Sequence, residues 1–296
     1  MKFDPRAAFG ERARALPHMG IGISTEFQAQ AQGGLDPVQL NREHPGLVRF
    51  LEVGADLERG LDQDTLDWVQ RGLPTTYHFL DINLEEREDL DPEWIKATRV
   101  LARQINAAWL CGDAGVWHAG ARDRGHGTLL PPILEFDVAA CMASNVRFLR
   151  EAIGMEVLPE NPPAQAFVGR MHLLDFFGEL CTKADSGMLL DVAHLAIYQH
   201  VMGFSALDGL DRFPLDRVVE VHVAGAEVFE SDGHTFIDDS HGCDVQSATW
   251  EILEYVLPRA DQLRAIIFEC ERNSIPEVLP TFERIQETWK RLGDAQ

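Results

Sequence analysis

The sequence predicts an α/β fold: a single parallel (β/α)8 barrel of the TIM type that spans residues 1–296. Eight short apolar runs alternate with helix-like amphipathic patterns along the chain. The length suits one such barrel, and no low-complexity segment or linker divides the chain. The expected strands are residues 19–24, 48–54, 75–80, 107–112, 155–160, 187–192, 218–223 and 264–269.

Helical patterns fill the segments between the expected strands. Asp91, followed by a proline, is expected to cap one helix, and Ser247 is expected to cap another. Gly154 marks the end of a third helix, because glycine readily ends helices. The last pattern, 276–293, contains Pro280, which we expect in the first turn or at a kink. Each expected strand is therefore followed by a helix, as the barrel requires.

Two connections are too long to be simple turns. Residues 113–133 and 224–246 both follow the carboxyl end of an expected strand, and both are rich in His, Asp and Gly. Long ordered loops in compact domains often form lids or the walls of a site. We therefore expect both loops to border the functional site.

The composition excludes several classes of function. The formal net charge of −22 repels a phosphate backbone, so nucleic acid is not an expected partner. No run approaches the ~20 apolar residues of a membrane span, so no membrane association is expected. The first twenty residues lack the apolar segment of a signal peptide, which favours a cytoplasmic location. The five cysteines contain no CxxC pair and are expected to be free thiols.

Metal-ligand residue types stand at the ends of the expected strands. Glu160, Asp191, His222 and Glu269 end the fifth to eighth strands, whose carboxyl ends are neighbours on the active-site face of a barrel. Three carboxylates and an imidazole that meet without Lys or Arg would repel one another, and a cation would remove that repulsion. For any one residue alone, a strand-end salt bridge or a helix cap is the alternative. Together they predict a catalytic metal site.

Five further residues are candidate metal ligands. Asp239 and His241 lie two residues apart and would face the same side of an extended segment. His194 lies three residues after Asp191 and would share its side of a helical turn. The remaining two candidates, His78 and Asp113, end the third and fourth expected strands.

Each of these five residues also has a structural alternative. His78 could be a hydrogen-bonded core histidine, Asp113 a cap or loop residue, and His194 a helix-start residue, while Asp239 and His241 could lie in a solvated loop. Two more histidines, His118 and His126, lie in the first long loop and rank below the others.

The number of candidate ligands exceeds the coordination shell of one ion. Four to six ligands fill one shell, so the set predicts two or three ions. Mixed carboxylate and imidazole ligands suit iron, manganese or zinc, and the residue types do not choose between them.

Other common mechanisms lack their motifs. The sequence contains no GxSxG, no P-loop and no HExxH. Its four lysines all lie outside the ends of the expected strands, which argues against a Schiff-base aldolase.

An ordered series of short motifs is similar to those of a known family. The motifs are Leu51-Glu52-Val53, His78, Glu160-Asn161-Pro162, Leu190-Asp191-Val192, His222-Val223-Ala224-Gly225, Asp239-Ser240-His241, and Glu269-Cys270-Glu271 with Asn273 and Pro276. In this series the chain resembles the multinuclear non-heme iron-dependent oxidases formerly grouped as DUF692, which include the oxidase of methanobactin biosynthesis. The likeness runs from about residue 20 to 280.

This resemblance implies a TIM-type barrel that holds two or three irons, with mixed Fe(II) and Fe(III). It also implies O2-dependent oxidation of a ribosomally synthesised precursor peptide, often at cysteine, and often with a small partner protein that presents the peptide. Three positions depart from the family pattern: Gly54 replaces a histidine, Gly112-Asp113-Ala114 replaces Ser-Glu-His, and His194 replaces an asparagine. His194 or Asp113 could compensate for the missing ligands.

Two other functions fit the same residues. The set Glu, Asp, His, Glu on consecutive strands is also similar to the xylose-isomerase-like sugar isomerases and epimerases, which use a single divalent metal. That class does not explain the additional Asp239 and His241. The other alternative is a non-catalytic metal-handling protein that binds a peptide.

Overall fold

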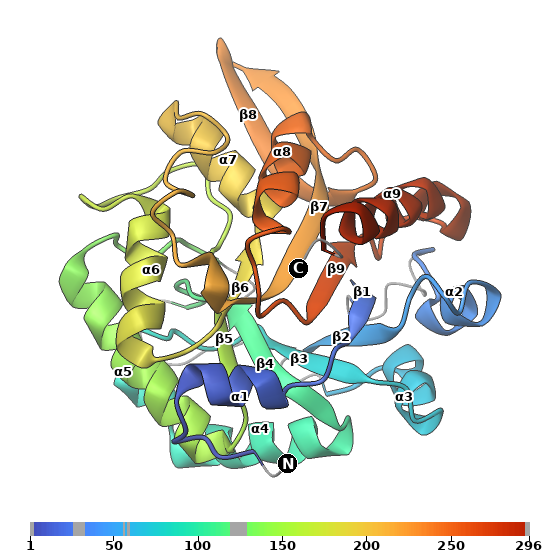
Figure 1. Ribbon diagram of the computed structural model, residues 1–296, viewed down its shortest axis with the longest axis horizontal. Coiled ribbons are helices and arrows are strands. Elements are labelled where there is room, and N and C mark those ends of the chain that lie inside the picture. Colours follow the sequence, from blue (N-terminus) through green and yellow to red (C-terminus); the bar gives the residue numbers. More distant parts are fainter. Residues whose placement is uncertain (1–2, 26–32, 56, 58–59, 119–128, 294–296) are drawn as a thin grey trace.

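The computed structural model describes residues 3–25, 33–55, 57, 60–118 and 129–293. Eight parallel strands close into a barrel with helices around its outside, so the expected (β/α)8 fold is confirmed (Figure 1). The barrel strands are β1 (Gly20–Ser24), β2 (Phe50–Ala55), β3 (Thr75–Phe79), β4 (Ala107–Asp113), β5 (Val157–Glu160), β6 (Met188–Asp191), β7 (Val218–Ser231) and β9 (Ala265–Glu269).

The barrel closes where β1 pairs on one side with β2 and on the other with β9. Gly22 is in register with both Phe50 and Ile267. A Cβ at position 22 would lie only 2.5 Å from the Phe50 ring, so glycine at this position lets the aromatic ring fill the barrel interior.

Helices cover the outside of the barrel in the expected order. Asp91 accepts hydrogen bonds from the amides of Glu93 and Trp94, so it caps its helix as predicted, and Gly154 ends another in the left-handed conformation at φ 79°. The main helices are α1 (Phe9–Ala15), α2 (Pro37–Glu43), α3 (Gln63–Gln70), α4 (Pro92–Gln104), α5 (Phe136–Ile153), α6 (Leu173–Ala184), α7 (Val192–Met202), α8 (Ser247–Val256) and α9 (Ile275–Gly293).

The structure decides two details of the helix prediction. The residue before α8 is Gln246, whose side chain bonds to the Ala226 carbonyl, so Ser247 is the first helical residue and not the cap. Pro280 lies inside α9, which begins at Ile275, so of the two expected positions the first turn is excluded. No helix in the described ranges is long and apolar enough to cross a bilayer.

The barrel interior is apolar at one end and polar at the other. Along β4 the inward side chains are Trp109, Cys111 and Asp113, because alternate residues of a strand face the same side. In β9 the order is Ala265, Ile267 and Glu269. The alternation that fills the lower barrel with apolar side chains therefore also points a carboxylate into the mouth.

Helix α1 packs against the lower end of the barrel. Phe9 and Ala13 join the apolar cluster of the interior, and the buried Arg12 guanidinium bonds to Glu156 at 2.6 Å. Both side chains are at most 1% exposed, so each charge depends on the other for its compensation.

The segment 224–246, expected as a loop, is largely a β-hairpin. β7 continues beyond the barrel and turns into β8 (His234–Gly242), which pairs with it in antiparallel register from Ser231↔His234 to Gly225↔Gly242. The hairpin projects from the barrel beside α7 and α8 (Figure 1). Val228 pairs with Ile237 and Phe229 with Phe236 across the two strands, and the turn Ser231-Asp232-Gly233 suits a tight connection. The other expected loop, 113–133, is described only in part.

Candidate metal centre

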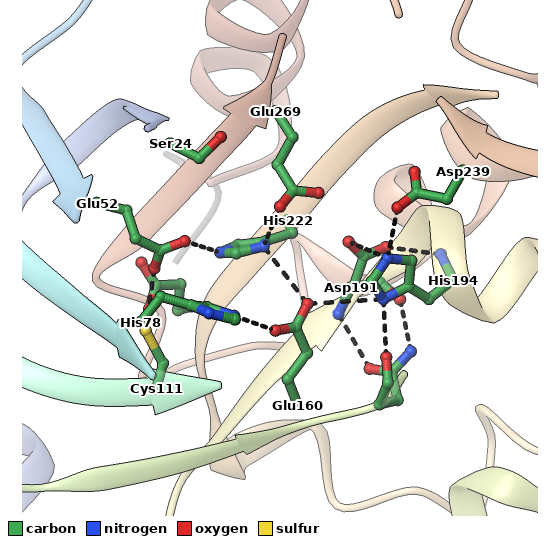
Figure 2. A network of polar contacts seen from close by, with 12 residues as sticks. Ser24, Glu52, His78, Cys111, Glu160, Asp191, His194, His222, Asp239 and Glu269 are labelled. Carbon is green, nitrogen blue, oxygen red and sulfur yellow. Dashed lines mark hydrogen bonds and ion pairs between the residues drawn. The ribbon is translucent and has the colours of Figure 1, made fainter. Parts of the chain in front are cut away.

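The four residues expected to be catalytic meet inside the mouth of the barrel (Figure 2). Glu160, Asp191 and Glu269 are the last residues of β5, β6 and β9, and His222 pairs in register with Asp191 from the neighbouring strand β7. All four are buried, with at most 7% of any residue exposed. Four strands distant in the sequence therefore deliver their side chains to one volume.

Asp191, His222 and Glu269 form the centre of the array. Each offers one ligand atom, and these atoms lie within 4.8 Å of one another. His222 Nδ1 lies 3.2 Å from Glu269 Oε1 and 3.5 Å from Glu160 Oε1. Asp191 also caps α7, because its Oδ1 accepts the amide of His194 at 2.6 Å, which leaves Oδ2 directed into the mouth.

A second group lies towards β3 and β4. His78 Nε2 bonds to Glu160 Oε2 at 2.7 Å, and Asp113 completes a set whose ligand atoms lie within 4.8 Å. Glu160 belongs to this group and also to one with Asp191 and His194, so it lies between the two sides of the array.

The third group includes the residues delivered by the hairpin. Asp239 Oδ2 lies 3.1 Å from both His194 Nε2 and His241 Nε2, so one carboxylate oxygen faces two imidazoles. Glu269 joins this group, with Oε2 3.7 Å from His241 Nε2. The structure therefore brings together all nine residues that the sequence suggested as ligands.

Burial and charge shift the pKa values of these groups strongly. Burial alone would lower the pKa of His78, but the hydrogen bond and charge of Glu160 raise it to about 9. Burial, reinforced by the charge of Glu160, raises the pKa of Asp113 to about 7. Burial would raise the pKa of Glu269, yet the charges of His241 and His222 lower it to about 2. His78 and Glu269 thus favour their charged forms, whereas the environment of Asp113 favours its neutral form.

The donor set fits metal ions. Within the described part of the chain, no Lys or Arg forms an ion pair with any carboxylate of the array. Several buried ligand atoms also make no hydrogen bond, although some lie within ion-pair distance of a neighbour: Asp113 Oδ1, Asp191 Oδ2, His222 Nδ1 and Nε2, Asp239 Oδ1 and Glu269 Oε2. Buried polar atoms are normally paired, so an array of unpaired carboxylate and imidazole atoms calls for a cation.

The sequence-based ligand set omitted two glutamates of the site. Glu52, in the middle of β2, lies 3.1 Å from His222 Nε2, and Glu271, just beyond β9, bonds to His241 Nδ1 at 2.7 Å. Both belong to the motifs that resemble the family, and a glutamate inside the otherwise apolar run 48–54 was the available signal for Glu52. Below them the buried Glu220 accepts a bond from Trp109 Nε1, and burial raises its pKa to about 8.

Of the two lower-ranked histidines, His118 does not join the array. His118 Nε2 bonds to the buried Asp89 at 2.7 Å, and the Asn83 side chain binds the backbone of the same segment. This cluster anchors the start of the loop after β4. His126 lies outside the described residues.

Comparison with solved structures supports the fold. The chain is similar to a D-tagatose 3-epimerase-like protein, with a TM-score of 0.57 and 16% identity over 93% of this chain and 98% of that one. It is equally similar to a xylose isomerase-like TIM barrel protein from Mycobacterium smegmatis in complex with magnesium, with a TM-score of 0.57 and 11% identity over 95% and 99% of the two chains. The barrel is therefore of the xylose-isomerase-like type, as expected.

Curated proteins also match most of the chain. A UPF0276 protein from Rhizorhabdus wittichii is 25% identical over 252 residues, which cover 83% of this chain and 87% of the relative. A UPF0276 protein from Acaryochloris marina is 27% identical over 259 residues, or 86% and 87% of the two chains.

A family model gives the assignment that these relatives leave open. The model described as "RiPP precursor modification enzyme MbnB/TglH/ChrH" matches residues 18–291, which include every strand of the barrel and every candidate ligand. RiPPs are ribosomally synthesised and post-translationally modified peptides, so the resemblance stated from the motifs is confirmed. The chain belongs to the MbnB/TglH/ChrH family of RiPP precursor modification enzymes.

Proposed function

We propose that this chain is a multinuclear, non-heme iron-dependent oxidase that uses O2 to modify a ribosomally synthesised precursor peptide, often at cysteine. Membership of a RiPP-modifying family supports a peptide substrate. The proposal of more than one ion rests on one observation: the group of His78, Asp113 and Glu160 shares no residue with the group of His194, Asp239 and Glu269. Two separate sets of three ligands call for more than one ion.

The nine ligands divide between the ions as follows. Glu160, Asp191, His222 and Glu269 would hold the central ion. Asp239 and His241, with His194, would hold a neighbour, while His78 and Asp113 would complete the position beside β3 and β4. Bound irons would supply redox chemistry and would lower the pKa of a substrate thiol.

The residues of the chain contribute a rigid and enclosed site. The strand ends fix the ligands, since most are buried and held by the barrel register. Burial of the carboxylates strengthens their attraction for a cation, because few water molecules compete. The hairpin carries Asp239 and His241 from outside the barrel to the mouth, so it would form one wall of the path by which a peptide enters.

The structure also keeps the sugar isomerase or epimerase as a second candidate. The structural neighbours named above support a barrel of the same type, and Asp191, His222 and Glu269 could hold one divalent ion. The third candidate is a non-catalytic protein that handles metal and binds a peptide. We favour the oxidase because His78 and the hairpin residue Asp239 belong to separate groups of ligands, so the whole set exceeds the shell of a single ion.

Metal analysis separates the first two candidates. The oxidase predicts two or more irons per chain with visible absorption after anaerobic loading, whereas the isomerase predicts one colourless divalent ion. A Glu160→Gln variant should lose iron, because Glu160 faces both His78 and His222. The matched control is Glu283→Gln on the exposed side of α9.

Catalysis is tested with the iron-loaded protein, a candidate precursor peptide and O2. We expect O2 consumption and a changed peptide mass by mass spectrometry. A protein that binds the irons and the peptide but leaves O2 and the peptide mass unchanged would be the non-catalytic binder. A short reading frame beside this gene that encodes a cysteine-containing peptide would supply the substrate, and a second one the partner protein.

A further inference from the structure

We propose that Glu52 and Glu271 are positioning residues that determine which imidazole nitrogen His222 and His241 present to the metal centre. His222 presents Nδ1, and His241 presents Nε2. The inference rests on the proposed metal centre and deepens it, because the two glutamates lie behind the ligands and outside the predicted ligand set.

Glu271 holds the outer side of His241. Its Oε1 lies 2.7 Å from His241 Nδ1, and its Oε2 accepts the hydroxyl of Ser24 at 3.0 Å. Glu271 is itself 5% exposed, so the carboxylate is fixed from both oxygens. With Nδ1 bonded to Glu271, the ring directs Nε2 towards Asp239 Oδ2 at 3.1 Å.

The backbone of His241 is held by the same segment. His241 adopts φ 51°, in the left-handed region that non-glycine residues seldom occupy. The Asn273 amide donates to the His241 carbonyl at 2.8 Å and to the Cys270 carbonyl at 3.1 Å. Two side chains that follow β9, Glu271 and Asn273, therefore fix the ring and the backbone of a residue on β8. Strain of this kind is retained where the surroundings fix the residue for a purpose.

Glu52 plays the corresponding part for His222, on the side of the array away from His194 and Asp239 (Figure 2). Its Oε1 lies 3.1 Å from His222 Nε2, and its Oε2 accepts the hydroxyl of Thr76 and the thiol of Cys111. The carboxylate is 2% exposed and is held by two neighbouring strands. With Nε2 facing Glu52, His222 Nδ1 points to Glu269 Oε1 at 3.2 Å.

The two histidines need different nitrogens because they approach from different directions. His222 lies in the barrel wall, where Glu52 is across the interior, while His241 enters from the hairpin with Glu271 behind it. His194 repeats the arrangement with a neutral partner, since its Nδ1 faces the Asn161 carbonyl at 2.9 Å and its Nε2 faces Asp239. An outer partner of this kind fixes the tautomer of an imidazole ligand, and a carboxylate partner also makes it a stronger donor.

The test uses zinc as a diamagnetic probe of the full chain. Histidine with isotopically labelled ring nitrogens reports by NMR which nitrogen binds the ion, and competition with a chelator reports affinity. We expect zinc at Nδ1 of His222 and at Nε2 of His241 in the unmodified protein.

The variants separate orientation from charge. Glu271→Gln keeps an acceptor for Nδ1 but loses the charge, so Nε2 should remain the ligand while affinity falls by about 10–100-fold. Glu271→Ala removes the acceptor, so the preference of His241 for Nε2 should also be lost. Glu52→Gln should weaken the ion at His222 to a similar degree. Glu283→Gln is the matched control and should bind zinc as the unmodified protein does.

Three results would overturn the inference. Zinc at Nδ1 of His241, or at Nε2 of His222, contradicts the assignment. Unchanged affinity in Glu271→Gln and in Glu52→Gln excludes a positioning role. If each variant lost affinity equally at every ion, and lost folding stability to the same degree, both glutamates would have only a structural role. A protein that takes up no zinc, iron or manganese at all refutes the proposed metal centre itself.

Discussion

Without metal, the protein should become less stable as the pH rises from about 6.5 to about 9. The reason lies in His78, whose pKa rises from 6.5 to about 9 in the folded protein because of Glu160. A group whose pKa is higher in the folded state binds more protons there, so its stabilising contribution is full below pH 6.5 and is lost as the pH passes about 9. The same sign holds for His194, His222 and His241, whose pKa values are raised against the effect of burial by their neighbouring carboxylates.

The size of the effect follows from the pKa of His78. Each pH unit between the folded and unfolded pKa corresponds to about 1.4 kcal/mol, so His78 alone contributes about 3 kcal/mol. The side chain is only 10% exposed, so solvent screens the interaction with Glu160 weakly. This is a large share of a typical free energy of unfolding.

Urea denaturation of chelator-treated protein between about pH 6 and 10 measures this loss. The variant His78→Gln is the control, since its curve should lack about 3 kcal/mol of the dependence. In the metal-loaded protein the ion would replace the shared protons, so the decline with rising pH should largely disappear. A metal-free protein equally stable at both ends of the range would refute the reasoning, as would a His78→Gln variant with an unchanged curve.

Three further predictions concern other parts of the molecule. Arg12→Met should lower the free energy of unfolding, measured by urea denaturation, by about 3–5 kcal/mol, because the Glu156 carboxylate is left buried without its partner. The double variant Arg12→Met with Glu156→Leu should recover most of this free energy, and equal losses in both variants would contradict the prediction. Gly54→Ala should lower the free energy of unfolding by about 1–3 kcal/mol, because the added Cβ would lie 2.9 Å from the Thr25 carbonyl oxygen. A melting temperature equal to that of the unmodified protein would contradict this, because it would mean that the strand shifts without cost. His194→Asn should weaken metal binding, measured by competition with a chelator, by more than the about 10–100-fold that is typical of a residue hydrogen-bonded to a ligand. His200→Asn, an exposed residue on the same helix, is the control and should leave the affinity unchanged. Equal affinities in the two variants would exclude His194 as a ligand.

The sequence alone determined the barrel fold and the position of the site at the carboxyl ends of the strands. The alternation of apolar runs and amphipathic helices specifies parallel strands with helices outside, because each pattern buries one face of its element. Glu160, Asp191 and Glu269 stand at the ends of their runs, and parallel strands must bring such ends to one face. Their meeting could therefore be expected from their positions in the chain.

The hairpin depended more on tertiary structure. Residues 224–246 contain only short apolar stretches among His, Asp and Gly, so the local pattern was typical of a loop. The pairing with β7 extends that strand beyond the barrel, and it is backbone hydrogen bonding between β7 and β8 that sets the register. This register brings Asp239 to His194, two residues that lie 45 positions apart in the sequence.

The partners behind the ligands were decided only by the tertiary structure. Glu52 faces His222 across 170 residues of sequence, and Ser24 reaches Glu271 across 247, so no local pattern relates them. A sequence shows which side chains could bind a metal, because their chemistry and their place on a strand are local properties. Which nitrogen or oxygen each one directs inward depends on contacts that form only when the barrel closes.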